Sequence, residues 1–268
     1  MGFPTRFAIA FVGLALIGGG TAVFLGYVQP MLEASRIQIL QKKHSGNLDL
    51  VAMAIKSYDQ HTYTIHYPRG VSVPIPTPGT PGNERLPPGG TYSPSGEPRH
   101  GWMTYLLPQL GLDDVYTRVD FNRPWNDPSQ RVLFVKPVPM YQSPIIKDPT
   151  HDSSGYAVAH FAGNQLVLLK NDGMKVADIT DGLGTTVVAG DAAGQYVAWG
   201  SPENLRDLTL GLAGNPAGFG GPDLGRTGPG ALLLMADGSV QWVSASVAPA
   251  VLKALATPAG GEPAPKLP

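Results

Sequence analysis

The longest feature of the hydrophobic pattern is an uninterrupted apolar block near the amino terminus. Residues 7–28 contain no charged side chain. At a rise of ~1.5 Å per residue, a helix of this length extends ~33 Å, which is enough to cross a ~30 Å hydrocarbon layer. A secretory signal peptide usually has a shorter apolar core of about 7–15 residues before a cleavage site, and no clear site follows this block. The pattern therefore predicts a retained transmembrane anchor over residues 1–29.

Beyond Pro30 the pattern becomes amphipathic. The apolar positions recur at the spacing of one helical face, at Leu48, Val51, Ala52, Ile55 and Tyr58. Residues 31–61 are therefore predicted to form a helix that continues from the anchor. Pro30 is expected to bend this helix where it leaves the membrane, and Gly46 with Asn47 forms a second weak point.

Short apolar runs typical of β-strands fill the second half of the chain. They cover residues 165–169, 184–189, 196–199, 230–235 and 239–243. Asp237 and Gly238 lie between the last two runs, and this pair favours a tight hairpin because glycine tolerates a positive φ. Residues 101–116 are expected to form a short helix. Residues 247–256 are expected to form another helix near the end of the chain.

The predicted domain organisation follows from these elements. Residues 30–256 are expected to form one α+β domain, in which the long amino-terminal transmembrane and amphipathic helix packs on an antiparallel β-sheet. Residues 67–98, rich in proline and glycine, form an extended loop within this domain. Residues 257–268 form a disordered tail. A membrane-spanning helix followed by this layout is pilin-like, as in type IV pilins and pseudopilins.

Composition narrows the functional classes. The 268 residues carry a formal net charge of −1, which gives no electrostatic footprint for nucleic acid. The chain has 34 glycines and 27 prolines, and only 15% of its residues are charged, which favours turns and short strands over a helical bundle. Because there is no cysteine, disulfides, thiol catalysis and cysteine-type zinc sites are excluded.

No residue pattern points to catalysis, a metal or a cofactor. The three Asp-Gly pairs lack the spacing of a calcium loop. Residues 151–153 combine His, Asp and Ser, but adjacency in sequence gives no triad geometry, and there is no G-x-S-x-G elbow. The closest two histidines, His61 and His66, have no third ligand nearby, and residues 218–221 do not complete a nucleotide-binding pattern. We therefore expect no enzymatic activity, no metal and no cofactor.

The four tryptophans leave one alternative open. Trp102, Trp125, Trp199 and Trp242 either belong to the core or present a surface that binds sugar or protein. A cleft with convergent acidic residues and exposed tryptophans would favour a tethered carbohydrate-binding protein or enzyme.

Seven segments of the chain, in consistent order, resemble a known family. They are residues 30–36, 47–58, 100–108, 121–128, 176–186, 236–240 and 255–262. In that order they are similar to PAVQAAR, NLKQIGLALHNY, (S/G)W…LLPYL, PW(N/D)xP, ITDGTSNT, DGSV and LATxAGGE of the DUF1559 family. This is a large planctomycete group with a pilin-like amino terminus and a carboxy-terminal H-x9-DG motif. The resemblance carries over a structural set of motif residues: Trp102, Pro108, Trp125, Asp181, Gly182, Asp237 and Gly238.

The chain departs from the family pattern in three places. The pilin-type start would have glutamate as the fifth mature residue, and residues 2–7 read GFPTRF, which argues against prepilin processing and pilin-style polymerisation. Thr227 stands where the histidine of H-x9-DG would fall. The cysteines that many relatives carry are replaced near His44 and by Gln142, which is consistent with the loss of one disulfide.

The resemblance implies a membrane-anchored, pilin-like structural or interaction protein of the cell envelope. Its expected partners are the lipid bilayer, through one helix, and pilin-like proteins in homo- or hetero-oligomers, and not nucleic acid. A minor pseudopilin of a type II secretion or type IV pilus-like system stays an alternative. The resemblance also implies a single-pass protein of the inner membrane whose carboxy-terminal domain is periplasmic or extracellular. The positive charges of Arg36, Lys42 and Lys43 favour the opposite orientation.

Overall fold

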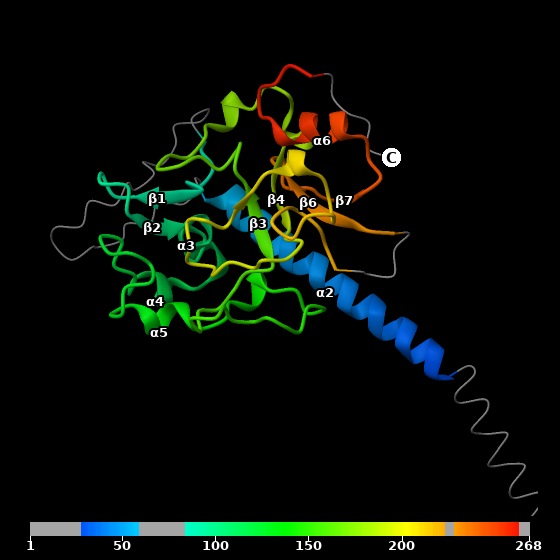
Figure 1. Ribbon diagram of the computed structural model, residues 1–268, viewed down its shortest axis with the longest axis horizontal. Helices are drawn as coiled ribbons and strands as arrows, with labels where there is room; N and C mark the ends of the chain where they lie inside the picture. The colour runs from blue at the N-terminus through cyan, green and yellow to red at the C-terminus, as the bar shows by residue number, and fades with distance from the viewer. Residues whose placement is uncertain (1–27, 59–83, 223–227, 263–268) are drawn as a thin grey trace, which may run out of the picture. The chain divides into compact units, whose positions relative to one another are not determined.

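The computed structural model describes residues 28–58, 84–222 and 228–262 (Figure 1). The chain divides into two compact units, residues 1–42 and 43–268. The predicted anchor at residues 7–28 lies outside the described residues except for Val28, as do residues 67–83 of the predicted loop and residues 263–268 of the predicted tail. Over the ranges that are described, no helix combines the length and the apolarity that a bilayer crossing needs.

Short elements separated by turns make up most of the described chain. In chain order they are α2 (Gln29–Ser57), β1 (Gly90–Tyr92), β2 (Pro98–Gly101), α3 (Trp102–Tyr105), η2 (Pro108–Leu110), α4 (Asp113–Tyr116), α5 (Arg131–Phe134), η3 (Pro139–Tyr141), β3 (Phe161–Asn164), η4 (Val176–Asp178), η5 (Leu183–Thr185), β4 (Val187–Asp191), β5 (Leu205–Arg206), η6 (Leu208–Leu210), β6 (Gly230–Met235), β7 (Val240–Ser244) and α6 (Pro249–Ala256). The mixed α+β class predicted from the sequence is confirmed.

The amphipathic helix predicted after Pro30 is present as α2. It runs through Gly46 and Asn47 without interruption, so this pair is not a break in the helix. The side-chain amide of Asn47 donates hydrogen bonds to the carbonyl oxygens of Pro139, at 3.0 Å, and Gln142, at 2.8 Å. These bonds tie the helix to the start of η3 and to the residue that follows it, and they use a residue that favours caps and turns in a stabilising long-range contact. The predicted bend at Pro30 concerns a junction with residues outside the described ranges.

Five strands form one mixed sheet in the order β5-β3-β4-β6-β7. The pairs β3–β4, β4–β6 and β6–β7 are antiparallel, whereas β5 pairs with β3 in parallel. The prediction of a purely antiparallel sheet is therefore wrong at this edge. Asp191, at the end of β4, is opposite Phe161, at the start of β3. The chain therefore leaves β4 near the start of β3. The following strand, β5, lies on the other side of β3 and runs in the same direction as β3.

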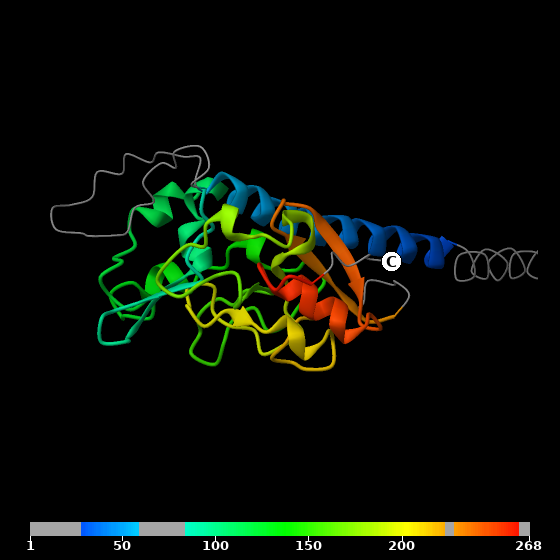
Figure 2. The same ribbon diagram turned by 90° about the horizontal axis from the view of Figure 1, so that it is seen from above.

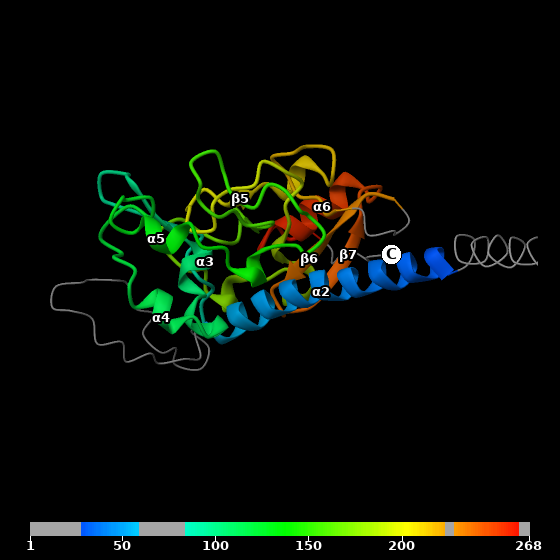
Figure 3. The same ribbon diagram turned by 90° about the horizontal axis from the view of Figure 1, so that it is seen from below.

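α2 and α6 pack on opposite faces of this sheet (Figure 2, Figure 3). Successive residues of β6 point to opposite faces, as in any strand. Leu232 and Leu234 join the core that contains the buried face of α2. Leu233 and Met235 join a second core with α6. Because β6 is buried on both faces, its sequence is a continuous apolar run instead of an alternating one.

Two of the predicted strands are not strands. Residues 165–167 form a turn after β3, because the Asn164 side-chain oxygen accepts a hydrogen bond from the N–H of Leu166, at 3.1 Å. The apolar side chains that suggested a strand, Val167 and Leu168, are buried from this turn. Residues 196–199 contribute only an isolated bridge between Ala198 and Val158.

The helix predicted from residue 101 is divided into α3, η2 and α4. Leu107 keeps helical dihedral angles (φ −54°, ψ −44°), but Pro108 has no N–H to donate, and a separate 3₁₀ turn starts there and ends at Gly111, which has φ = 72°. The terminal helix predicted at 247–256 is confirmed as α6.

The hairpin predicted at Asp237 and Gly238 is confirmed between β6 and β7. The N–H of Ser239 donates to the Asp237 carboxylate at 2.8 Å, and Met235 N–H donates to the Ser239 carbonyl at 2.8 Å. Gly238 has φ = 89°, in the left-handed region that favours glycine. The last turn of α2 lies beside it, because a Cβ at Gly238 would meet the side chain of Lys56.

Two glycine-to-alanine changes are expected to have opposite effects on stability. Gly238→Ala should lower the free energy of unfolding by about 1–2 kcal/mol, because alanine is strained at a positive φ. Gly46→Ala should raise it by about 0.5–1 kcal/mol, because Gly46 is inside α2 and a Cβ there would contact nothing within 4 Å. Urea denaturation of the full-length protein, followed by tryptophan fluorescence, measures both. Equal signs for the two changes would contradict the assigned backbone conformations.

Candidate functional site

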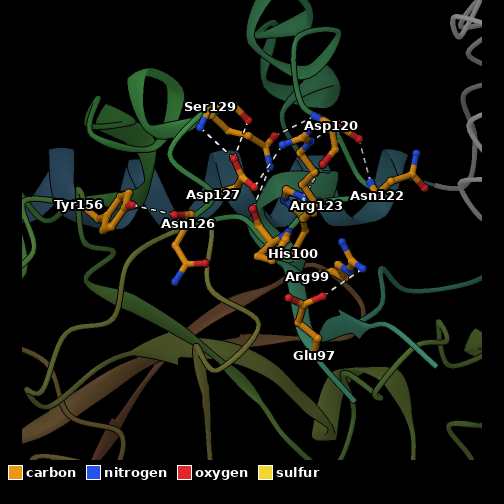
Figure 4. A network of polar contacts seen from close by, with 12 residues as sticks. Glu97, Arg99, His100, Asp120, Asn122, Arg123, Asn126, Asp127, Ser129 and Tyr156 are labelled. Carbon is orange, nitrogen blue, oxygen red and sulfur yellow. Dashed lines mark hydrogen bonds and ion pairs between the residues drawn. The ribbon is translucent and has the colours of Figure 1, made fainter. Parts of the chain in front are cut away.

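One loop, residues 120–130, is held against β2 by polar contacts (Figure 4). The backbone N–H of Trp125 donates to the carbonyl oxygen of Arg99 at 3.0 Å. Nε2 of His100 lies 3.2 Å from the carbonyl oxygen of Asp120 and 3.1 Å from that of Arg123. Asp120, Arg123 and Trp125 of the loop are therefore all in contact with the same strand, β2.

Side chains within the loop fix its shape further. Gln130 is buried; its Oε1 accepts from the Asp120 N–H at 2.8 Å, and its Nε2 donates to the Pro124 carbonyl at 2.9 Å. Arg123 pairs with Asp120 at 3.2 Å and with Asp127 at 3.4 Å. Hydrogen bonds from the Ser129 hydroxyl and backbone N–H lower the pKa of Asp127. The guanidinium of Arg123 is thus already occupied within the loop.

His100 is the buried histidine behind this loop. Its ring packs between Phe121 and Phe134, with centroid distances of 4.9 and 5.7 Å. Burial lowers the pKa of His100 from 6.5 to about 4, and the carbonyl contacts, which raise it, only partly offset this effect. Because Nε2 faces carbonyl oxygens, we assign the hydrogen of the neutral ring to Nε2, which then donates. Nδ1 has no hydrogen-bond partner among the described residues.

A pocket of about 330 Å³ opens beside the loop. Its lining residues are Glu97, Pro98, Pro124, Trp125, Asn126, Ser201 and Glu203. They come from the start of β2, from the 120–130 loop and from the segment before β5. The volume is at the small end of the ~300–1,000 Å³ range of ligand pockets. Three segments far apart in sequence thus build one concave, partly apolar and acidic site.

Trp125 forms a fixed wall of this pocket. Its ring packs edge-to-face with Phe134 (centroids 6.0 Å apart, 79°) and with Tyr156 (4.8 Å, 66°). The hydroxyl of Tyr156 donates to the Asn126 carbonyl at 3.0 Å. Gly200 lets these rings approach, because a Cβ there would clash with Phe134 and come within 3.2 Å of Trp125. The wall is therefore preformed.

The two carboxylates of the pocket have different environments. Oε2 of Glu97 pairs with Arg99 at 3.1 Å. Glu203 is exposed, its backbone N–H donates to the Ser201 hydroxyl at 3.2 Å, and within the described ranges its carboxylate has no ion pair. Burial raises the pKa of Tyr92, and the negative charge of Glu203 raises it further. Of the two, Glu203 is thus the carboxylate without an ion pair among the described residues.

The motif residues predicted from the sequence occupy three places. Trp102 is fully buried, and its Nε1 donates to the Asn204 carbonyl at 3.1 Å. Pro108 is buried at the start of η2. Trp125 is the only residue of the predicted set that lines the pocket.

The remaining motif residues join the chain end to the sheet. Asp181 accepts hydrogen bonds from the N–H groups of Gly260, at 2.6 Å, and Gly261, at 3.0 Å. Gly182 follows it in the turn before η5. The N–H of Asp237, in the hairpin with Gly238, donates to the Leu183 carbonyl at 3.0 Å. These motifs thus support the fold, and they bring residues 258–261 of the predicted tail into contact with the domain.

Sequence reasoning missed a buried polar pair between α2 and β4. Nε2 of His44 lies 2.9 Å from Oδ1 of Asp191, and the two side chains are 0% and 1% exposed. The ring N–H is not aligned with this line, so the contact is an electrostatic pairing and not a well-directed hydrogen bond. Oδ2 of Asp191 accepts from the Leu232 N–H at 2.8 Å. No sequence motif connects these residues.

Glu97 and Glu203 could not be predicted as site residues, because they meet only through the fold, whereas Asn126 follows Trp125 in the PW(N/D)xP-like segment. Across the described parts of the chain, no three His, Asp or Glu side chains are grouped closely enough to hold a metal ion.

The fold and the site together define an α+β domain with a helix on a mixed sheet and a preformed acidic pocket. A family model described as "Protein of unknown function (DUF1559)" matches residues 82–204. This match confirms the resemblance to the DUF1559 family over residues 82–204, and the matched region contains every residue that lines the pocket. Neither the curated proteins nor the solved structures gave a match.

Proposed function

We propose that the protein is a membrane-anchored, pilin-like structural or interaction protein of the cell envelope, without catalytic activity. In this proposal residues 1–29 hold it in the inner membrane as a single-pass protein. The carboxy-terminal domain is periplasmic or extracellular. Its partners are the bilayer and pilin-like proteins, as homo- or hetero-oligomers, and not nucleic acid.

The observation that carries this proposal is that α2 is buried on one face in its second half and exposes apolar side chains in its first half. From His44 to Ile55 the helix has a buried face that belongs to the domain core. Between Val28 and Ile39 its apolar side chains are exposed: Met31 by 73%, Leu32 by 58% and Ile39 by 67%. Exposed apolar residues directly after an uncharged block of 22 residues favour a covering by lipid or by neighbouring helices.

The contacts that the described histidines make support the absence of catalytic activity in this proposal. His44 pairs with Asp191 in the core, and His100, His151 and His160 each have a ring nitrogen within hydrogen-bond distance of a backbone carbonyl oxygen. Burial lowers the pKa of both His100 and His160. These side chains stabilise loops and layers of the fold, so they are not free for acid–base work on a substrate.

Cell fractionation tests the membrane attachment. The full-length chain should stay in the membrane fraction after alkaline carbonate washing, and deletion of residues 7–28 should release it. In a separate experiment on the full-length chain, protease added to intact spheroplasts should remove a carboxy-terminal tag before the spheroplasts are lysed. A full-length chain that carbonate extracts would contradict the anchor. Protection of the tag until lysis would contradict the localisation.

The pseudopilin alternative makes a separate prediction about the amino terminus. A processed filament subunit would lose residues before its mature start near Gly2. The absence of a glutamate at the fifth mature position disfavours this processing. An intact mass that includes Met1 would remove the alternative, and a processed mass would favour it.

A further inference from the structure

The pocket beside Trp125 combines negative charge, a rigid aromatic wall and two prolines. We propose that it binds the cationic side chain of a partner polypeptide, a lysine or an arginine. The charged head would lie between Glu203 and Glu97, and the aliphatic stem would lie along Trp125, Pro98 and Pro124. This inference concerns residues 97–203 and does not depend on membrane attachment.

Charge is the first argument for a cation. Two carboxylates line the pocket and no basic side chain does. Two arginines of the segments that build the pocket already have partners: Arg99 pairs with Glu97, and Arg123 pairs with Asp120 and Asp127. Glu97 already pairs with Arg99, but covering Glu203 with a neutral ligand would remove its carboxylate from water without compensation, whereas a cation supplies an opposite charge.

The wall of the pocket is the second argument. Indole is the best aromatic surface for a cation, and arginine and lysine stems pack well on apolar rings. Phe134 and Tyr156 hold Trp125 in place, so little side-chain order is lost on binding. The same domain already uses such contacts, because Arg131 lies 4.6 Å from the ring centroid of Tyr156 and Lys170 lies 3.8 Å from that of Tyr92.

The polar groups fit a saccharide less well. A sugar ring presents many hydroxyls that need both donors and acceptors. Here the Ser201 hydroxyl already accepts from Glu203, and Asn126 is the one other uncharged polar side chain of the lining. The acceptors of the pocket are therefore mostly anionic, which matches an ammonium or guanidinium group.

Nuclear magnetic resonance of the tryptophan indoles tests the proposal on the full-length, ¹⁵N-labelled chain in a neutral detergent. Trp125→Phe assigns the Trp125 indole signal among the four tryptophans. The probes are Nα-acetyl-L-arginine amide, Nα-acetyl-L-lysine amide, the neutral Nα,Nε-diacetyl-L-lysine amide, and methyl β-D-glucoside. We expect saturable shifts of the Trp125 signal with the two cations, and weaker binding at higher salt.

Two variants sharpen the test. Glu203→Gln keeps the shape of the side chain and should weaken binding of the arginine probe roughly tenfold, as expected for a charged hydrogen bond. Glu33→Gln makes the same chemical change on the exposed surface of α2 and should leave binding unchanged. Unchanged signals of the other tryptophans confirm that each variant is folded.

Three results would overturn the inference. One is the absence of a saturable shift with either cation. Another is equal binding of the neutral acetylated lysine, which would indicate an apolar site. The last is a combined result, in which the glucoside binds and Glu203→Gln does not change the affinity for the two cations. This result would favour the carbohydrate-binding alternative.

Discussion

Asp191→Ala is expected to lower the free energy of unfolding by about 3–5 kcal/mol, the typical cost of removing one partner from a buried pair. The substitution removes the carboxylate that lies 2.9 Å from Nε2 of His44, and it leaves the N–H of Leu232 without its acceptor in the core. Each unpaired buried group costs about 1–3 kcal/mol on its own. The change also leaves a cavity between α2 and the sheet, because Asp191 is 1% exposed.

Two controls separate charge, hydrogen bonding and surface effects at Asp191. Asp191→Asn keeps an acceptor for Leu232 and should cost less than alanine. Asp172→Ala removes an exposed partner of Arg85 and should cost below about 1 kcal/mol, because surface pairs contribute little. Chemical denaturation of the full-length protein gives all three values. If the variants at 191 and 172 are equally mild, the His44–Asp191 pair does not stabilise the core.

Stability is also expected to fall by about 3 kcal/mol between pH 6.5 and pH 4 through His100 alone, since each pKa unit is worth about 1.4 kcal/mol. Burial lowers the pKa of His100 from 6.5 to about 4 in the folded state. Above pH 6.5 the ring is neutral in both states and contributes no pH dependence. As the pH falls through 6.5 the unfolded chain binds a proton that the folded protein does not, so stability decreases until the pH is below about 4, where both states are protonated.

His100→Gln provides the test, because the glutamine amide can donate to the carbonyls of Asp120 and Arg123 as Nε2 does. The variant should be less stable at pH 7.5, because it loses the ring contacts with Phe121 and Phe134. Its stability should then fall less steeply than that of the wild type between pH 6.5 and 4. Parallel pH profiles for the two proteins would show that His100 is not buried in its neutral form.

The elements predicted well are those whose signals are local. The helical spacing of Leu48, Val51 and Ile55 identified the buried face of α2, and Asp237 with Gly238 identified the hairpin. Both patterns reflect short-range geometry, a helical period and a positive φ. The family resemblance over residues 82–204 was equally visible, because motifs and their order are properties of the sequence itself.

The features that were missed depend on contacts between distant segments. The apolar run after β3 became a turn because Asn164 bonds the following backbone, and its amide also donates to the carbonyls of Val187 and Ala256. The parallel edge strand β5 is only two residues long and follows from the position of β4. The pocket needs Glu97 and Glu203 to meet across three segments, and no spacing rule joins residues so far apart.

The sheet order has a consequence for synthesis of the chain on the ribosome. The buried face of α2, among the first described residues to be translated, packs with Leu232 and Leu234 of β6, which emerge near the end. The central strand β4 likewise gains its second neighbour only when β6 appears. Such non-local pairings make folding slow, because loop closure must precede the contacts that stabilise it. The core around α2 therefore cannot be completed until translation is almost finished, and folding of the whole sheet is a late event.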